Sequence, residues 1–169
     1  MDAFVQATRQ SMAAKNWYAS LFVALSMPDI CGKLENPDQF SSERYKGWFD
    51  KYMAEHYTSR IGPDRREHVF LSAADCYALR CSFLHEGEDE LGGQRCREVL
   101  ERIHFVAPVQ NMTIHCNQMN NVLQVQVDIF CEEICGGVIR WLEDVTGNPD
   151  VQQRIASLAK IYSPFDPVH

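Results

Sequence analysis

The chain has 169 residues and a formal net charge of −7, with 46% apolar and 23% charged residues. These values are close to the average for soluble globular domains, and they exclude a chain that is disordered over most of its length. The acidic balance also argues against a protein that coats nucleic acid non-specifically, because neutralising phosphates requires many cations.

The longest mostly apolar run, residues 18–27, is shorter than the roughly 20 residues that a transmembrane helix needs, so we expect no membrane contact. The first ten residues lack a basic segment followed by an apolar core, which predicts that no secretory signal is present. The seven cysteines show no disulfide-framework spacing. We therefore expect a cytoplasmic protein with reduced thiols.

In chain order, the first element is a helix predicted over residues 2–26, where apolar residues recur at three- and four-residue intervals. Pro28 is expected to end this helix, because proline cannot continue the hydrogen-bond ladder. A second helix is predicted from Ser41 or Ser42, either of which can cap it, to about His56. Residues 57–71 are expected to be irregular.

A capping signal at Ser72, with Asp75 three residues later, predicts a helix that runs to about Glu86. An acidic loop is expected over residues 87–93. Residues 102–107, 112–116 and 122–127 then alternate between apolar and polar types, which indicates two or three short strands.

Two further helices are predicted after these strands. Asp128 can cap the first, which should run to about Asp144, and Asn148 can start the last, to about Ile161. The predicted fold class is therefore mainly α, a helical bundle with a small β-hairpin or three-strand insertion around residues 102–127. Residues 1–162 are expected to form one domain and residues 163–169 a loose C-terminal tail.

Arg80 falls in the middle of the apolar stripe of the helix predicted from Ser72. An arginine is always charged, so on a buried face it needs a partner or an interface. His85 lies five residues later, about 140° around an ideal helix. In one straight helix the two side chains are not expected to converge readily on a small target, so an ion-paired Arg80 and an ordinary helix-end histidine remain an alternative to a joint site.

The segment ALRCSFLHEG, residues 78–87, resembles the Arg-x4–6-His signature of the HEPN superfamily, which lies late in a bundle helix. Residues 25–37 (LSMPDICGKLENP) and the following Arg44-Tyr45-x-x-Trp48-Phe49 are similar to a stand-alone bacterial, often plasmid-borne, HEPN subgroup. The resemblance covers about 70 residues.

The resemblance implies a HEPN-like helical domain and metal-independent cleavage of RNA by a homodimer whose two motifs face one cleft, with no cofactor and no metal. His85 would act as general base on the ribose 2′-hydroxyl or as acid to the leaving oxygen, and Arg80 would stabilise the phosphate. An antitoxin or a nucleotidyltransferase is a further partner that it implies.

The resemblance also marks residues that would contact RNA or support the catalytic pair: Cys81, Ser82, Glu86, Asp29, Arg44 and Tyr45. Active members usually carry a polar residue directly after the arginine, where this chain has Cys81. This difference leaves open a catalytically silent HEPN fold that serves as a dimeric RNA-, nucleotide- or protein-binding module.

A zinc site is a less favoured alternative, with ligands from His115-Cys116 and from Cys131 and Cys135. Core packing is the preferred interpretation for the last two, because they share a helix face with apolar residues. Gly136-Gly137 in the same helix is expected to permit close helix packing or a kink.

Overall fold

The computed structural model describes residues 1–91, 98–162 and 164, and within them the chain forms six α-helices and two small sheets. This confirms the predicted mainly helical fold with a β insertion. The helices are α1 (Asp2–Ala13), α2 (Trp17–Glu35), α3 (Ser41–Tyr52), α4 (Ala73–His85), α5 (Val127–Asp144) and α6 (Pro149–Ala156), with a 3-10 turn at Ala54–Tyr57. The strands are β1 (Thr58–Ile61), β2 (Arg66–Val69), β3 (Arg102–Val106), β4 (Asn117–Met119) and β5 (Val122–Gln126).

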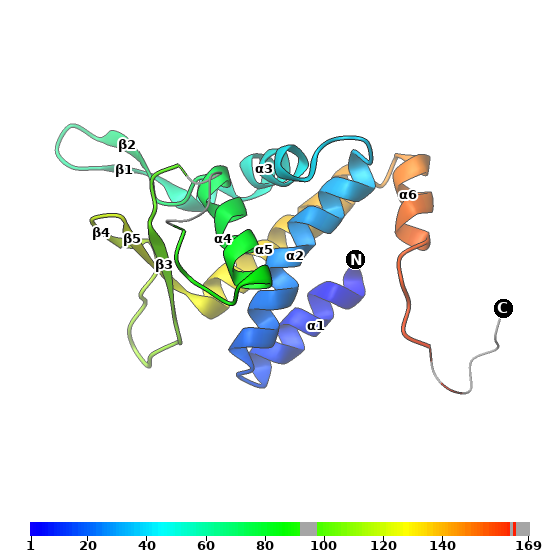
Figure 1. Ribbon diagram of the computed structural model, residues 1–169, viewed down its shortest axis with the longest axis horizontal. Helices are drawn as coiled ribbons and strands as arrows, with labels where there is room; N and C mark the ends of the chain where they lie inside the picture. The colour runs from blue at the N-terminus through cyan, green and yellow to red at the C-terminus, as the bar shows by residue number, and fades with distance from the viewer. Residues whose placement is uncertain (92–97, 163, 165–169) are drawn as a thin grey trace.

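Figure 1 shows both sheets at one end of the molecule and α4 between them and the other helices. The central helix is α2, which packs against all five other α-helices. Its buried residues lie on several sides and include Leu21, Leu25, Met27 and Pro28. A helix that is apolar all round belongs in the core of a bundle.

The predicted first helix starts at Asp2 as expected, but it is wrong in its middle and at its end. The chain breaks at Lys15, whose φ of 57° lies in the left-handed region, and Asn16 then caps α2 by accepting a hydrogen bond from the Ala19 N–H. Pro28 does not end α2, which continues to Glu35. Packing on every side stabilises α2 enough to outweigh the one backbone hydrogen bond that the proline removes.

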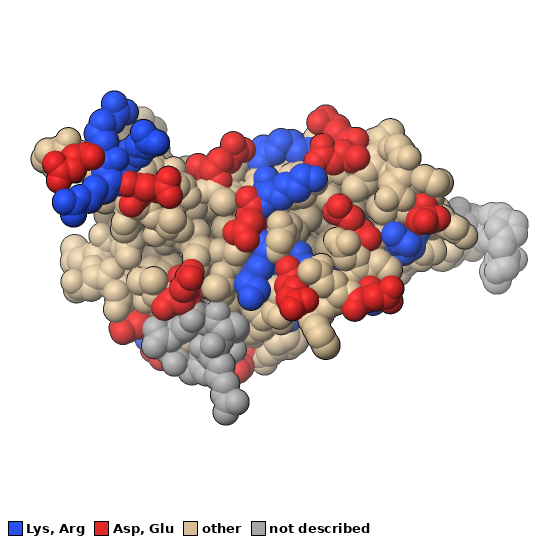
Figure 2. Space-filling model, turned by 90° about the horizontal axis from the view of Figure 1, so that it is seen from above, with Lys and Arg blue, Asp and Glu red and all other residues tan. Residues whose placement is uncertain are grey.

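The second predicted helix ends earlier than expected, at Tyr52, and its N-cap is Phe40, which makes no side-chain cap. The following segment, predicted to be irregular, contains the antiparallel hairpin β1–β2, in which Thr58 pairs with Val69. Both strands are mostly exposed on both faces, so they lack the apolar alternation that marks a strand in sequence. Figure 2 shows basic side chains gathered on this hairpin, next to acidic ones.

The helix predicted from Ser72 is confirmed as α4, with the Ser72 hydroxyl accepting a hydrogen bond from the Asp75 N–H. The acidic loop predicted after it is described only as far as residue 91. In the second sheet β3 pairs with β5 in parallel and β4 pairs with β5 antiparallel. The central strand of this sheet is β5, and the second of the three predicted strands lies at Asn117–Met119 rather than at residues 112–116.

The last two helices hold the bundle together from the C-terminal side. Helix α5 starts after Gln126, so Asp128 lies inside its first turn rather than at the cap, and α6 ends at Ala156 instead of Ile161. The Arg154 side chain donates to the Leu34 carbonyl at 2.6 Å and ties α6 to the end of α2. The predicted tail, residues 163–169, lies outside the described residues apart from Pro164. No helix in the described part of the chain has the length and apolar character needed to cross a bilayer.

Candidate active site

Arg80 and His85 meet at the end of α4. One terminal guanidinium nitrogen of Arg80, Nη1, lies 3.1 Å from Nε2 of His85. The prediction that one helix keeps the two apart is therefore wrong. The bonds from Cα to Cβ tilt toward the start of a helix, so the ring of His85 at the last position leans back toward the turn that carries Arg80, and the long arginine side chain covers the remaining distance.

This contact indicates which nitrogen of the His85 imidazole accepts a hydrogen bond. A guanidinium has only donors, so Nε2 of His85 accepts the hydrogen bond and is unprotonated in this arrangement. His85 is exposed, whereas only 18% of the Arg80 side chain is exposed. The pair thus presents an exposed imidazole beside an anchored cation, and its Nε2 lone pair can act as a base only when the contact with Arg80 opens.

The anchor is the carboxylate of Asp29, on α2. Nη2 of Arg80 donates to Oδ2 of Asp29 at 2.8 Å, and Nε of Arg44, on α3, donates to Oδ1 of Asp29 at 3.1 Å. The hydroxyl of Ser41 donates to the same Oδ1 at 3.1 Å. One carboxylate therefore joins three helices and receives hydrogen bonds from two arginines.

Two cations share this one anion, so the cluster of Arg80, Asp29 and Arg44 carries a net positive charge. Burial opposes the charge of Arg80, but the nearby Asp29 carboxylate and Cys81 raise the pKa of its guanidinium above the ordinary value. Arg80 is therefore permanently charged at the surface where His85 is exposed, which suits an anionic ligand.

Gly32 allows α2 and α3 to approach at this point, and sequence reasoning did not identify it. A Cβ at Gly32 would lie 3.0 Å from the Arg44 carbonyl oxygen and 3.1 Å from the Arg44 Cβ. Its place one helical turn after Asp29 puts a close contact of the two helices beside the ion pair. Ser41 was identified only as a cap, but its hydroxyl binds the carboxylate.

The structure brings Asp29 and Arg44 to the predicted pair but places two other predicted residues elsewhere. Tyr45 is fully buried, and its hydroxyl lies 3.5 Å from Sγ of Cys76, so it packs in the core. The Ser82 hydroxyl is buried and donates to the Glu90 carbonyl at 2.8 Å, on the segment after α4. Neither side chain can touch a ligand held by Arg80.

Cys81 and Glu86 flank the pair in sequence, and Cys81 lies close enough to Arg80 to raise the pKa of its guanidinium. Cys81 is half-buried beside Tyr77, where burial of Tyr77 and the nearby Cys81 thiol raise the pKa of the tyrosine. Glu86 is exposed and follows His85 directly as the C-cap of α4. Their predicted roles remain predictions.

A second cluster of titratable groups lies around Glu133, on α5. The Tyr57 hydroxyl donates to Oε2 of Glu133 at 2.6 Å, and Nε2 of His115 lies 3.4 Å from Oε1. His56 approaches the same oxygen to 3.7 Å. In the part of the chain that the structure describes, neither ring nitrogen of His115 makes a well-directed hydrogen bond, so its attraction to Glu133 is mainly electrostatic.

We expect this cluster to make stability depend on pH. Burial opposes the charge of His115, but Cys116 and Glu133 raise its pKa from 6.5 to about 9. A raised histidine pKa adds stability that is complete below pH 6.5 and is lost as pH rises through 9. The rise corresponds to up to about 3 kcal/mol. Urea unfolding of the wild type and of His115→Gln at pH 6, 7.5 and 9.5 should give a difference in unfolding free energy that shrinks with pH; a constant difference would contradict the prediction.

The zinc alternative gains no support from the geometry. Cys131 and Cys135 are fully buried among apolar residues. Within residues 1–91, 98–162 and 164, no group of three or more His, Cys, Asp or Glu side chains could hold a metal ion.

Comparisons of the chain with models of protein families, with curated proteins and with solved structures found no match.

Proposed function

We propose that the protein is a metal-independent endoribonuclease of HEPN type, in which Arg80 and His85 act on the substrate. The observation that supports this best is the 3.1 Å contact between Nη1 of Arg80 and Nε2 of the exposed His85. An imidazole beside an anchored cation is a pairing that supports cleavage of an RNA phosphodiester once the phosphate displaces Nε2 from Nη1.

In the proposed reaction, the substrate phosphate displaces Nε2 of His85 from Nη1 of Arg80, and the freed Nε2 removes the proton from a ribose 2′-hydroxyl. The 2′-oxygen then attacks the adjacent phosphorus, forming a new oxygen–phosphorus bond, while the bond from phosphorus to the 5′-oxygen breaks. Arg80 stabilises the charge on the non-bridging oxygens. The products are a 2′,3′-cyclic phosphate and a 5′-hydroxyl, and DNA is not cut because it has no 2′-hydroxyl.

The departing 5′-oxygen needs a proton, and His85 of one chain cannot give it while it is taking one from the 2′-hydroxyl. A second copy of the chain, related by a two-fold axis, would bring a second His85 to the same cleft. The proposal therefore requires a homodimer, and sedimentation or light scattering at micromolar concentration should detect it.

A catalytically silent fold that binds RNA, a nucleotide or a protein is the second candidate, and one observation favours it. Nη2 of Arg80 is already bound to Asp29, Nη1 is bound to His85, and within the described residues the buried Nε makes no hydrogen bond. A phosphate must therefore compete with His85 for Nη1 of Arg80, or bind the remaining N–H groups of Nη1 and Nη2.

The test is incubation of a mixed RNA pool with the purified wild type in EDTA, next to His85→Ala. We expect cutting that leaves cyclic phosphate ends, and a loss of at least about 100-fold in the variant, which is the scale of general acid–base catalysis. His104→Ala is the matched control, because His104 is a partly exposed histidine on β3 outside the site. It should cut like the wild type.

Equal cutting by wild type and His85→Ala would overturn the assignment and indicate a contaminant or another site. No cutting by any of the three proteins, together with RNA binding that Arg80→Ala abolishes, would favour the silent binding module.

A further inference from the structure

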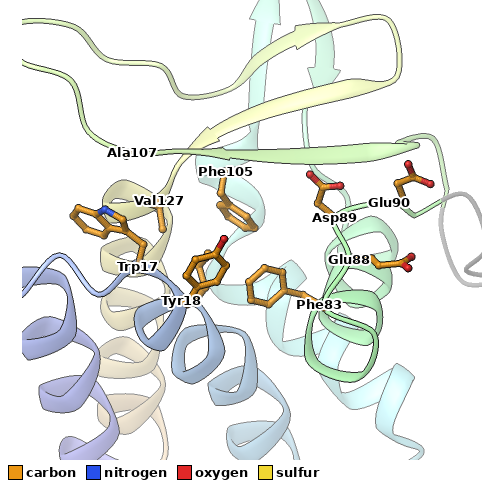
Figure 3. Close-up of a pocket in the computed structure, with 11 residues that line it drawn as sticks. Trp17, Tyr18, Phe83, Glu88, Asp89, Glu90, Phe105, Ala107 and Val127 are labelled. Carbon is orange, nitrogen blue, oxygen red and sulfur yellow. The ribbon is translucent and has the colours of Figure 1, made fainter.

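A pocket with aromatic walls and an acidic rim lies beside α4 (Figure 3). Its volume of about 680 Å³ is within the range of small-molecule sites in proteins. Trp17 and Tyr18 come from the start of α2, Phe83 from α4 and Phe105 from β3. Four aromatic side chains from three separate elements thus face one space.

The floor of the pocket is fixed by a chain of ring contacts. The centroids of Phe83 and Phe105 are 6.1 Å apart, and Phe105 lies 5.4 Å from Phe130, which is fully buried. Tyr18 is different, because 74% of it is exposed, although it lines the pocket. Its ring face is therefore available to a ligand that rests on the fixed floor.

The rim consists of three consecutive acids, Glu88, Asp89 and Glu90. Gly87, with a φ of 74°, turns the chain back after α4. The Asp89 carbonyl then accepts from the Ile103 N–H at 3.1 Å, so the segment is held along β3. Figure 3 shows the three carboxylates on one side of the aromatic rings.

The acids of the rim are only partly neutralised. Arg102 pairs with Asp89 at 3.5 Å and also with Glu90, and His104 lies 3.9 Å from Asp89. In the described part of the chain Glu88 forms no ion pair, and no lysine or arginine lines the pocket. The pocket therefore has a negative potential next to exposed aromatic faces.

From this arrangement we propose that the pocket binds a small organic cation, an amidinium, guanidinium or ammonium group on an apolar body. The apolar body would lie on Tyr18 and Phe105, and the cation would lie over the ring of Phe83 on the side of the acidic rim. Aromatic faces carry negative charge density, so rings and carboxylates select the same sign of charge.

This site is distinct from the Arg80–His85 site and does not depend on it. That site carries a net positive charge and suits phosphate, whereas the acidic pocket repels anions. Binding of an organic cation can therefore be present or absent whatever the outcome of the RNA cleavage test.

Isothermal titration calorimetry with three ligands of nearly the same shape tests the proposal. Benzamidine is a cation, benzamide is neutral and benzoate is an anion. We expect benzamidine to bind at least about tenfold more tightly than either of the others. Benzamide that binds equally well would overturn the proposal, since the pocket would then be merely apolar, and so would the absence of benzamidine binding.

Variants locate the binding. Tyr18→Leu should weaken benzamidine binding about fivefold, and Glu88→Gln about threefold. Glu67→Gln, which removes the same charge from the exposed strand β2, should leave the affinity unchanged. Equal losses in Glu67→Gln and Glu88→Gln would show only the effect of net charge and contradict the site. A lysine-rich peptide that binds through Tyr18 while benzamidine does not would assign the pocket to a protein partner instead.

Discussion

Replacing Asp29 with asparagine is expected to lower the free energy of unfolding by about 3 kcal/mol. The substitution keeps the shape of the side chain but removes the only carboxylate that, in the described structure, contacts Arg80 and Arg44. Only 18% and 15% of these arginine side chains are exposed, so water cannot replace the lost counter-charge. Two positive charges would then repel each other across the α2–α3–α4 junction.

Urea unfolding followed by far-UV circular dichroism measures this loss. Asp64→Asn is the matched control, because the partner of Asp64 is Arg66 and the two side chains are 72% and 83% exposed. Exposed pairs contribute little, so the control should change stability by less than about 0.5 kcal/mol. Similar stability of both variants would show that Asp29 does not hold the site, and the position of Arg80 would need another explanation.

The sequence predicts this site only in part, because the motif is local and the anchor is not. Arg80 and His85 are close in sequence, and an arginine on an apolar stripe already signals a partner. Asp29 lies 51 residues away from Arg80, and no periodicity indicates which acid is the partner. The resemblance identified Asp29 and Arg44 as candidates, and the contact between them required the tertiary structure.

The same distinction separates correct from incorrect elements of the fold. Helix α4 was predicted almost to the residue, because its cap at Ser72 is a local hydrogen bond. Helix α2 was misjudged because its continuation past Pro28 depends on packing against five other helices. The β1–β2 hairpin lies in a segment predicted to be irregular, because its mostly exposed strands lack apolar alternation.

The adjacent glycines of α5 should respond to alanine in opposite directions. A Cβ on Gly137 would lie 2.9 Å from Cη2 of Trp48 and 3.3 Å from Sδ of Met53. Trp48 is 4% exposed and packs on Tyr52, so its ring has no space to move into. We expect Gly137→Ala to destabilise the protein by about 1–3 kcal/mol.

Gly136 provides the matched control, because a Cβ there has nothing within 4 Å. Alanine is the better helix former, so Gly136→Ala should stabilise the protein by up to about 1 kcal/mol. Thermal and urea unfolding of the two variants would show the opposite signs, and two changes of the same sign would contradict the packing argument.

A third variant tests whether the indole of Trp48 is the group that blocks a side chain at Gly137. Trp48→Phe removes part of the ring that the new Cβ would meet. It should therefore cost less stability in the Gly137→Ala background than in the wild type, because contacting residues are not additive. Equal costs in both backgrounds would show that the clash is relieved elsewhere. The prediction that this glycine pair permits close helix packing thus applies to Gly137, which faces α3, and Gly136 marks a position where the helix gains nothing from the missing side chain.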